Sequence, residues 1–359
     1  MTEKKKNTLY VIGNGFDLCH DLDTSPTDFQ QFLAKQSVYN EIADAADVFM
    51  SINVDWSEYE ESLSAMDLDE LECDHLGSPD YLSDHESDRD GVIWDMEEFT
   101  RALKNSVDEA LREMVEAANE KLEHTHPVLR RFAAQGDAIL SFNYTSTVEE
   151  LYSPAEEVPI CHIHGYYENG DELLFGYKDG DKDSEYRERH FAESELRSLT
   201  EEMNRIKQDH TKNAEEKKTL LEEMQEHYDL LTANRDYYID EQRERIIDLY
   251  ASFQKMFQMQ KLEEFLDGLS DITEVVVMGH SMGDVDSDYM EMIEEKLHPE
   301  KWYISQYNND PNMATLSQYS FFDKHEFFDL RDEYGIAKGD FEALDHSITR
   351  DKDVAKNES

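Results

Sequence analysis

The feature that most constrains the fold is a set of short segments that are apolar at every position, separated by long stretches with helical periodicity. The clearest of these segments are residues 9–12, 138–140 and 275–278. A strand that is apolar on both faces must be covered on both faces, which is typical of a parallel sheet flanked by helices. The sequence therefore predicts an α/β fold with a doubly wound, mainly parallel, Rossmann-like sheet and large helical insertions.

Composition divides the chain into parts. Residues 185–266 contain no glycine or proline and repeat apolar side chains at helical spacing, so we expect a helical lobe in this stretch. The predicted parts are a first α/β part over 1–178 with a helical insertion at about 30–135, the lobe over 179–268, a second α/β part over 269–345 and a polar tail over 346–359.

Local patterns add narrower expectations. Short runs bounded by glycine, proline or asparagine predict strands, and a stretch dense in Asp, Glu and Ser at 67–90 predicts a solvated loop. Helical spacing places Trp94 on an apolar face together with Phe99 and Leu103. The strands predicted in this way cover 158–164, 173–175, 302–305 and 326–330.

Charge excludes several classes of partner. The 359 residues include 34 Lys and Arg against 84 Asp and Glu, which gives a formal net charge of −50 at pH 7. Such a surface repels phosphate backbones and anionic lipid head groups, so we expect neither general nucleic-acid binding nor membrane association. No segment reaches the ~18 apolar residues that a membrane span requires. The sequence predicts a cytoplasmic protein.

The cysteines indicate neither a disulfide framework nor a cysteine-rich metal site. Cys19, Cys73 and Cys161 are odd in number, widely scattered and contain no C-x-x-C pair. A histidine pair, His162 and His164, has the spacing seen in some zinc sites but lacks an identifiable third ligand. We therefore predict no metal.

Polar clusters follow four of the predicted strands at their carboxyl ends, the edge of a doubly wound sheet where ligands bind. Each cluster is a weak signal alone, and their shared placement is the evidence. The clusters are 13–17, 141–145, 162–165 and 279–284.

The first cluster contains Gly13, Asn14 and Gly15 at the end of a strand, which resembles a dinucleotide-binding turn. Leu18 stands where the usual fingerprint has its third glycine. Asp17 is a good cap for the following helix but repels phosphate. A simple glycine turn with a capping Asp therefore remains an equal alternative.

The second and third clusters contain candidates for acid–base work. We expect that His162 and His164 do not both point into the same pocket, and that one of them lies against the core or a helix. His164 precedes Gly165, where the strand opens into a loop, and is the better general acid or base. Asn143, also at a strand end, carries an amide that can hold a hydroxyl or a water.

The fourth cluster matches G-x-S-x-G over 279–283, the turn that presents a serine nucleophile in α/β-hydrolases. Ser281 would be that nucleophile. The chain that follows is short for the remaining strands, the acid and the histidine of that fold. A serine hydrolase is retained as an alternative.

Taken together and in this order, the motifs resemble the AbiH-type bacteriophage abortive infection proteins. The residues that carry the resemblance are 11–18 with His20, Leu22, Thr24, Asp28 and Phe29, then 56–60, 141–145, 162–165, and 279–281 with Asp284.

That family in turn is similar to sirtuin-type NAD-binding domains. Residues 13–15 resemble their glycine turn, and 279–281 resemble their Gly-Thr-Ser segment, which faces the cofactor phosphates and ribose. Asn143 falls where their strand-end Asn meets the nicotinamide ribose, and His164 where their catalytic His stands. This chain departs from the pattern by lacking a four-cysteine zinc ribbon, by larger residues at Phe16 and Asp17, and by Thr145 in place of an acid.

The resemblance implies an antiviral abortive infection effector that binds NAD or a related nucleotide and cleaves its N-glycosidic bond. The implied partners are this small nucleotide and a phage trigger, and the helical lobe is a candidate for regulation or homo-oligomer contacts. Alternatives are a nuclease-type or nucleotide-processing toxin, the serine hydrolase, and a non-catalytic nucleotide sensor. The predicted catalytic residues are Asn143, His164 and Asp17, and the predicted cofactor contacts are Gly13, Asn14, Gly15, Phe16, Gly279, His280, Ser281 and Asp284.

Overall fold

The computed structural model describes residues 7–38, 43–52, 54, 59–127, 129, 132–154, 157–233, 235–306 and 313–329. Within them, six parallel strands form one sheet in the order β5-β4-β1-β6-β7-β8. Counted along the chain, this is the 3-2-1-4-5-6 order of a doubly wound sheet, so the predicted Rossmann-like α/β fold is confirmed. The strands are β1 (Asn7–Ile12), β4 (Ala138–Ser141), β5 (Ile160–His162), β6 (Ile272–Met278), β7 (Lys301–Gln306) and β8 (His325–Asp329).

Apolar residues on both faces of the strands explain their burial. Alternate residues of β1 enter two different apolar clusters, with Leu9 and Val11 on one face of the sheet and Tyr10 and Ile12 on the other. The first cluster also contains side chains of α12 (Met259–Asp267) and α13 (Ser287–Leu297). The second contains side chains of α1 (Asn14–Cys19) and α7 (Thr147–Tyr152).

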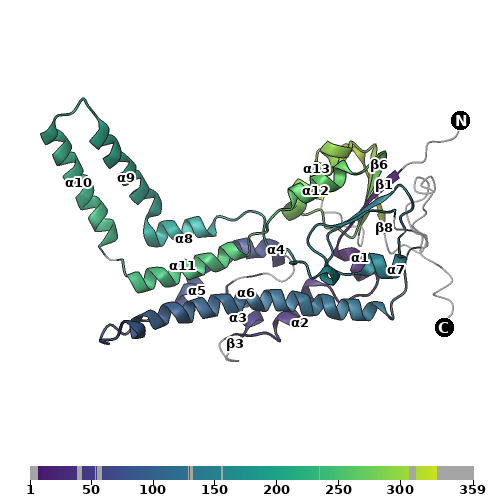
Figure 1. The fold of residues 1–359 in the computed structure, drawn as a ribbon, viewed down its shortest axis with the longest axis horizontal. Helices are drawn as coiled ribbons and strands as arrows, with labels where there is room; N and C mark the ends of the chain where they lie inside the picture. The colour runs from purple at the N-terminus through teal and green to yellow at the C-terminus, as the bar shows by residue number, and fades with distance from the viewer. Residues whose placement is uncertain are drawn as a thin grey trace.

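The predicted lobe over 179–268 and the predicted insertion at about 30–135 share one apolar core, and together they extend from the sheet as one helical body, called the helical lobe from here on (Figure 1). Its longest element is α6 (Glu86–Leu122), whose 37 residues span about 55 Å at 1.5 Å per residue. Helix α11 (Tyr237–Ser252) lies beside α6, and their facing side chains form the core of the lobe. The other helices of this part are α2 (Pro26–Leu33), α3 (Ala45–Ser51), α4 (Tyr59–Ser62), α5 (Leu68–His75) and α8 (Lys182–Phe191).

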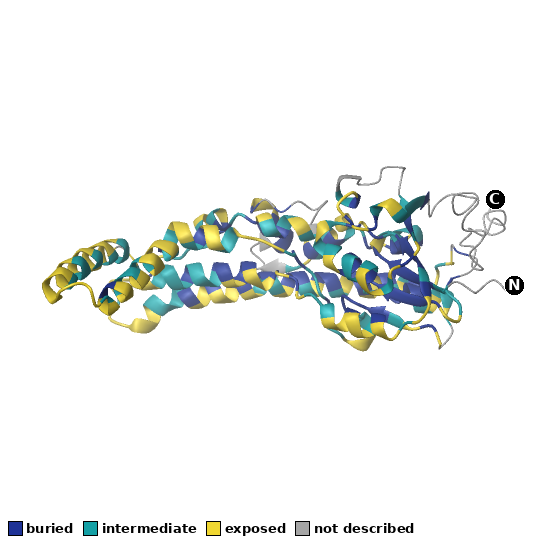
Figure 2. Cartoon of the chain, turned by 90° about the horizontal axis from the view of Figure 1, so that it is seen from above, coloured by how far each residue is buried: buried dark blue, intermediate teal, exposed yellow. Residues whose placement is uncertain are grey.

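A two-helix hairpin stands at the far end of the lobe. It consists of α9 (Glu193–Gln208) and α10 (Ala214–Thr232). Over its described residues α10 buries no side chain, and α9 buries Ile206 alone. Figure 2 shows the contrast between this largely exposed hairpin and the buried sheet.

Most of the predicted strands are present, and three local predictions are wrong. Residues 173–175 form no strand, although the Leu174 N–H donates to the His164 carbonyl. The stretch 67–90 contains α5, whose Leu68 and Leu71 are buried, together with the start of α6. Trp94 is 58% exposed because the buried stripe of α6 runs through Ile93 and Met96 instead.

Smaller elements and the remaining sequence predictions complete the description. A two-stranded pair of β2 (Ser37–Val38) and β3 (Ala43–Asp44) lies beside α6, and α14 (Met313–Leu316) precedes β8. No helix among the described residues is long and apolar enough to cross a membrane. Residues 56–58 of the family motif and the predicted tail over 346–359 lie outside the described residues.

Candidate functional site

The turns that follow β1 and β6 pack directly against each other at the carboxyl edge of the sheet. The Gly15 N–H donates to the Gly279 carbonyl at 2.7 Å. A Cβ atom on Gly13 would lie 2.6 Å from the His280 Cα, and one on Gly279 would lie 2.0 Å from the Phe16 nitrogen. These glycines are therefore required by the contact between the two turns, whether or not a ligand is bound.

The first turn offers few free amides to a phosphate. The N–H groups of Gly13, Gly15 and Phe16 donate to the carbonyls of Met278, Gly279 and Gly13. Asn14 is exposed, and its amide donates to the Thr24 carbonyl at 2.7 Å. Phe16 is fully buried with its ring 5.7 Å from that of Phe132, so it belongs to the core behind the site.

Asp17 forms a buried polar cluster with the segment after β4. One of its carboxylate oxygens accepts from the Thr145 hydroxyl at 2.7 Å, while the other is buried without a hydrogen-bond partner. Burial raises the pKa of Asp17 to about 6, although hydrogen bonds to the carboxylate partly oppose this effect by lowering the pKa. Asn143 is also buried, and its amide donates to the Gly13 carbonyl at 3.2 Å. Thr145 thus contacts the carboxylate of Asp17.

The two histidines at the end of β5 point in different directions. Residues two apart on one strand share a face, so this difference arises because β5 ends at His162 and His164 lies in the turn that follows. The His162 Nε2 lies 2.8 Å from the Glu149 carboxylate on α7, and its ring stacks on Tyr166 with centroids 4.1 Å apart. His164 lies on the other side, where it is 4% exposed, and its ring contacts Phe142 edge-on at 4.9 Å. His162 therefore belongs to a contact with a neighbouring helix, and His164 faces the carboxyl edge of the sheet.

Asp286 bridges His164 and His280, which come from the ends of different strands. One carboxylate oxygen lies 3.3 Å from the His164 Nε2, and the other lies 3.3 Å from the His280 Nε2. The Phe142 ring packs against both imidazoles. The Met282 N–H donates to the His280 Nδ1 at 2.9 Å, so the proton of a neutral His280 must sit on Nε2, facing Asp286.

Two further charged residues complete this cluster. Lys255 follows α11, and its side chain is fully buried with Nζ 3.3 Å from both Asp286 and Glu60. Glu60 belongs to α4 and also accepts from the Gly176 N–H at 3.2 Å. We call Glu60, His164, Lys255, His280 and Asp286 the edge cluster.

The charge states in the edge cluster follow from burial and proximity. Burial lowers the pKa of His164, and Lys255 lowers it further against the opposing effect of Asp286. Burial alone would raise the pKa of Asp286, but Lys255 and His164 hold it well below its usual range. Burial would lower the pKa of Lys255, but Glu60 and Asp286 raise it. At neutral pH the cluster therefore holds a neutral His164 beside an ionised Lys–Asp pair.

Sequence reasoning found the histidines of this cluster but missed other members. Asp284, a predicted cofactor contact, has an exposed side chain, and the carboxylate that contacts both histidines is Asp286, two residues later. Glu60 entered only as part of the family motif. Lys255 gave no signal, because a single lysine in a charged helical stretch looks like a solvated side chain.

The surroundings of Ser281 give no support to a serine nucleophile. Ser281 is exposed, and its hydroxyl accepts from the Gly283 N–H at 3.4 Å. Positive φ angles fall on Gly279 and Met282, and a 3₁₀ turn at Asp284–Asp286 separates β6 from α13. The nearby His280 is committed to Met282 and Asp286, so it is not placed as a base for this hydroxyl.

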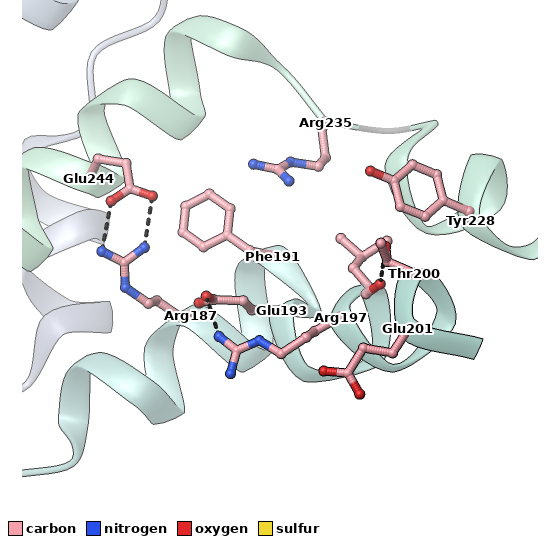
Figure 3. Close-up of a pocket in the computed structure, with 10 residues that line it drawn as sticks. Arg187, Phe191, Glu193, Arg197, Thr200, Glu201, Tyr228, Arg235 and Glu244 are labelled. Atoms are coloured by element: carbon pink, nitrogen blue, oxygen red, sulfur yellow. Dashed lines mark hydrogen bonds and ion pairs between the residues drawn. The ribbon is translucent and has the colours of Figure 1, made fainter. Parts of the chain in front are cut away.

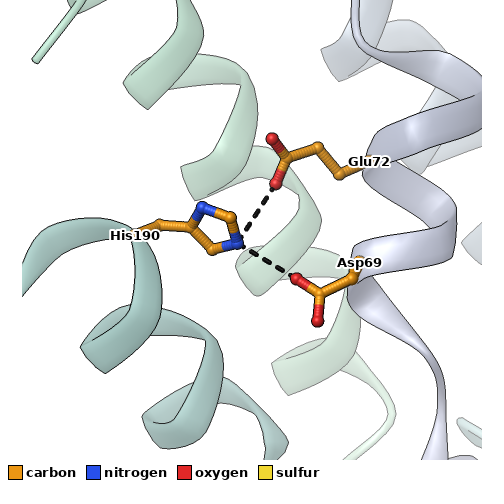
Figure 4. Close-up of side chains that lie close together, drawn as sticks. All are labelled: Asp69, Glu72 and His190. Carbon is orange, nitrogen blue, oxygen red and sulfur yellow. Dashed lines mark hydrogen bonds and ion pairs between the residues drawn. The ribbon is translucent and has the colours of Figure 1, made fainter.

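Asp69, Glu72 and His190 are the group of described residues with metal-ligand spacing, and Figure 4 shows them. The His190 Nε2 lies 3.0 Å from Asp69 and 3.4 Å from Glu72. Each carboxylate also binds a guanidinium, because Arg189 contacts Asp69 at 2.5 Å and Arg243 contacts Glu72 at 2.8 Å. The guanidinium groups of Arg189 and Arg243 neutralise the two carboxylates. We therefore describe Asp69, Glu72 and His190 with these arginines as an ion-pair clamp between α5, α8 and α11.

A cleft of about 440 Å³ opens between α8, α11 and the α9–α10 hairpin, as Figure 3 shows. Arg187 forms two hydrogen bonds of 2.9 Å with Glu244, and Arg235 lies over the Phe191 ring at 4.9 Å. The side chains of Arg187 and Arg235, which line the cleft, thus already contact neighbouring side chains. The cleft lies in the lobe, away from the strand ends that carry the sequence motifs.

Comparison with known proteins gives one family. The family described as bacteriophage abortive infection AbiH matches residues 9–306. The match begins within β1, ends with the last residue of β7 and includes every residue of the edge cluster. No curated protein and no solved structure gives a significant match.

Proposed function

Since this chain belongs to the AbiH family of bacteriophage abortive infection proteins, we propose that it acts by binding NAD or a related nucleotide at the carboxyl edge of its sheet and cleaving the N-glycosidic bond. The observation that carries the proposal is the position of the edge cluster. It lies beside the point where the strand order reverses between β1 and β6, which is where doubly wound sheets bind nucleotides.

The proposed reaction is the addition of water across the bond between nicotinamide and ribose. The bond breaks toward the nicotinamide nitrogen, which leaves with the electron pair, and the ribose passes through an oxocarbenium-like state. The water oxygen then bonds to the anomeric carbon and loses a proton. His164, which is neutral at pH 7, is the base that accepts this proton.

Asn143 and Asp17 are the groups proposed to face the ribose. The Asn143 amide supplies a fixed dipole, and Asp17 supplies a carboxylate oxygen that has no hydrogen-bond partner in the protein. Both favour positive charge on the sugar, since preorganised dipoles and charges act strongly where water is excluded. Ser281, exposed at the rim, is the proposed hydrogen-bond partner for a nucleotide hydroxyl or phosphate.

The test is nicotinamide release by purified protein incubated with NAD, followed by chromatography. We expect release by the parent protein, loss of release in His164→Ala and retention in His162→Gln, which alters a histidine that faces α7. In cells, induction should lower NAD before growth stops. Growth arrest with undiminished NAD, together with a His164→Ala variant as toxic as the parent, would overturn NAD cleavage but not the family assignment.

A further inference from the structure

We propose that Asp286 is the positioning residue of this site, holding the imidazoles of His164 and His280 on its two carboxylate oxygens, with Lys255 from the helical lobe fixing Asp286 in turn. The inference rests on the proposed function for the meaning of His164 as a base. The arrangement of the four side chains is a separate observation that can be tested without substrate.

The geometry assigns a direction to each proton. The His280 Nδ1 accepts from the Met282 N–H, so its Nε2–H points at Asp286. The His164 Nε2 lies 3.3 Å from the other oxygen of Asp286, an ion-pair contact, and it forms no hydrogen bond in the structure. Because a carboxylate accepts hydrogen bonds, it selects the form of His164 that is protonated on Nε2. The Nδ1 of His164 is then the basic nitrogen available to a substrate or a water.

The backbone of Lys255 is hydrogen-bonded to the neighbouring segment at 176–177. Its N–H donates to the Tyr177 carbonyl at 2.8 Å, and the Tyr177 N–H donates to the Phe253 carbonyl at 3.0 Å. Phe253 is fully buried in the core of the lobe. A Cβ on Gly176 would lie 1.9 Å from the Phe253 carbonyl oxygen, so the two segments are in the closest contact that glycine permits. These backbone hydrogen bonds and the close contact at Gly176 therefore position Lys255 so that its ammonium contacts Glu60 and Asp286.

A buried ion pair of this kind needs a reason other than stability. Removing two charges from water costs several kcal/mol for each ion, and well-packed apolar residues are often as stable. Lys255 makes its contacts with Glu60 and Asp286 inside the site, with no exposed side-chain surface. Holding Asp286 ionised and in one orientation beside His164 is the role that this placement explains.

The proposal predicts opposite responses of His164 to two substitutions. Asp286 favours the protonated imidazole and Lys255 disfavours it. Removing the carboxylate should therefore lower the pKa of His164, and removing the ammonium should raise it. A loss of packing alone would expose His164 to water and move its pKa upward in both variants. The titratable groups that face His164 are Glu60, Tyr144, Lys255, His280, Asp286 and Tyr289.

The experiment is an NMR titration of the whole protein labelled with ¹³C at the histidine Cε1, with the His164 signal identified by its loss in His164→Gln. We expect the pKa of His164 to fall in Asp286→Asn and to rise in Lys255→Met. Lys255→Arg, which keeps the cation, should restore the parent value. Asp288→Asn, a control two residues from Asp286 whose side chain is 52% exposed, should change nothing.

Activity gives the second readout. With NAD as substrate, Asp286→Asn should lower kcat by about 10²-fold or more with little change in KM, since it disorders a base that acts in the transition state. The acid limb of the pH–rate profile should move in the same direction as the His164 titration.

The possible outcomes are distinguishable. If Asp286→Asn and Lys255→Met move the His164 titration in the same direction, or leave it unchanged, the positioning role is refuted. If the opposite shifts are found but NAD is not cleaved, the positioning role stands and the proposed reaction fails. If Lys255→Met does not fold, the comparison of Asp286→Asn with the parent and with Lys255→Arg still decides, because only the first should lower the pKa.

Discussion

Gly279 provides the sharpest test of how the site is built. It has a φ of +68°, a region that L-residues with a side chain enter only at a cost. An alanine Cβ there would lie 2.0 Å from the Phe16 nitrogen and 2.3 Å from the Gly15 carbonyl carbon. Both neighbours are backbone atoms, so no side-chain rotation can relieve the contact. Gly279→Ala should therefore force the turns after β1 and β6 apart.

The magnitude combines two costs. The left-handed conformation costs about 1–2 kcal/mol for a residue with a Cβ, and forcing an extra methyl group into a packed region costs typically about 1–3 kcal/mol. Gly279→Ala should thus reduce the free energy of unfolding by about 2–5 kcal/mol. Gly170 is the matched control, because it has a φ of +70° and nothing within 4 Å of the added Cβ. Gly170→Ala should cost about 1–2 kcal/mol.

The assay is thermal unfolding of the ligand-free proteins by circular dichroism. Gly279→Ala should melt roughly 5–10 °C below the parent, and Gly170→Ala only a few degrees below it. Equal melting temperatures for the two variants would refute the claim that the turns pack at this distance. A Gly279→Ala protein as stable as the parent would mean that the glycine serves only the approach of a ligand.

Three further predictions test the charge and the lobe. Burial raises the pKa of Asp17 from 3.8 to about 6. Between pH 3.8 and about pH 6 the folded protein therefore binds more protons than the unfolded chain, and its stability falls as the pH rises through this range. Asp17→Asn should then stabilise the protein at pH 7.5 by up to about 3 kcal/mol, a gain that urea unfolding should show vanishing below pH 4. Glu72→Gln should weaken the clamp to Arg243 and His190, cost about 2 kcal/mol or more and speed amide exchange in α8. Replacing 194–233 by a short Gly-Ser linker should leave the melting temperature within about 2 °C of the parent, because α10 buries no side chain and α9 buries Ile206 alone; a collapse of the melting transition would show that the hairpin supports the lobe.

The sheet could be predicted because its strands carry their own signal. A run such as Val275–Met278 is apolar on both faces, and in this fold both faces are buried. Segments whose local composition indicates a different structure from the one they adopt were harder to predict. Residues 173–175 have strand composition but pair through one hydrogen bond to the loop after β5. Helix α5 lies in an acidic stretch that resembles a solvated loop. Asp67 caps this helix by accepting a hydrogen bond from the Glu70 N–H, and Leu68 and Leu71 bury it against the core.

The edge cluster could be predicted only in part, because its members are brought together by tertiary contacts. His164 and His280 follow strands, so the rule that ligands bind at carboxyl ends identified them. Glu60 and Lys255 are 195 positions apart in the chain and come from the two sides of the helical part. No local pattern marks such a pair. Lys255 stands two residues after Phe253, and the burial of that phenylalanine in the core of the lobe shows why this part of the chain turns inward.

The net charge of −50 acts in opposite directions on the two ends of the proposed substrate. The pyrophosphate is repelled, and the amides of the glycine turn are already engaged in the protein. The nicotinamide ring is cationic, and the ribose gains positive charge as the bond breaks. The carboxylates of Asp17, Glu60 and Asp286 outnumber the ammonium of Lys255 among the charged side chains described at this edge. Under the proposed reaction, such a site would stabilise the transition state more than the bound nucleotide, which is the condition for catalysis without tight binding.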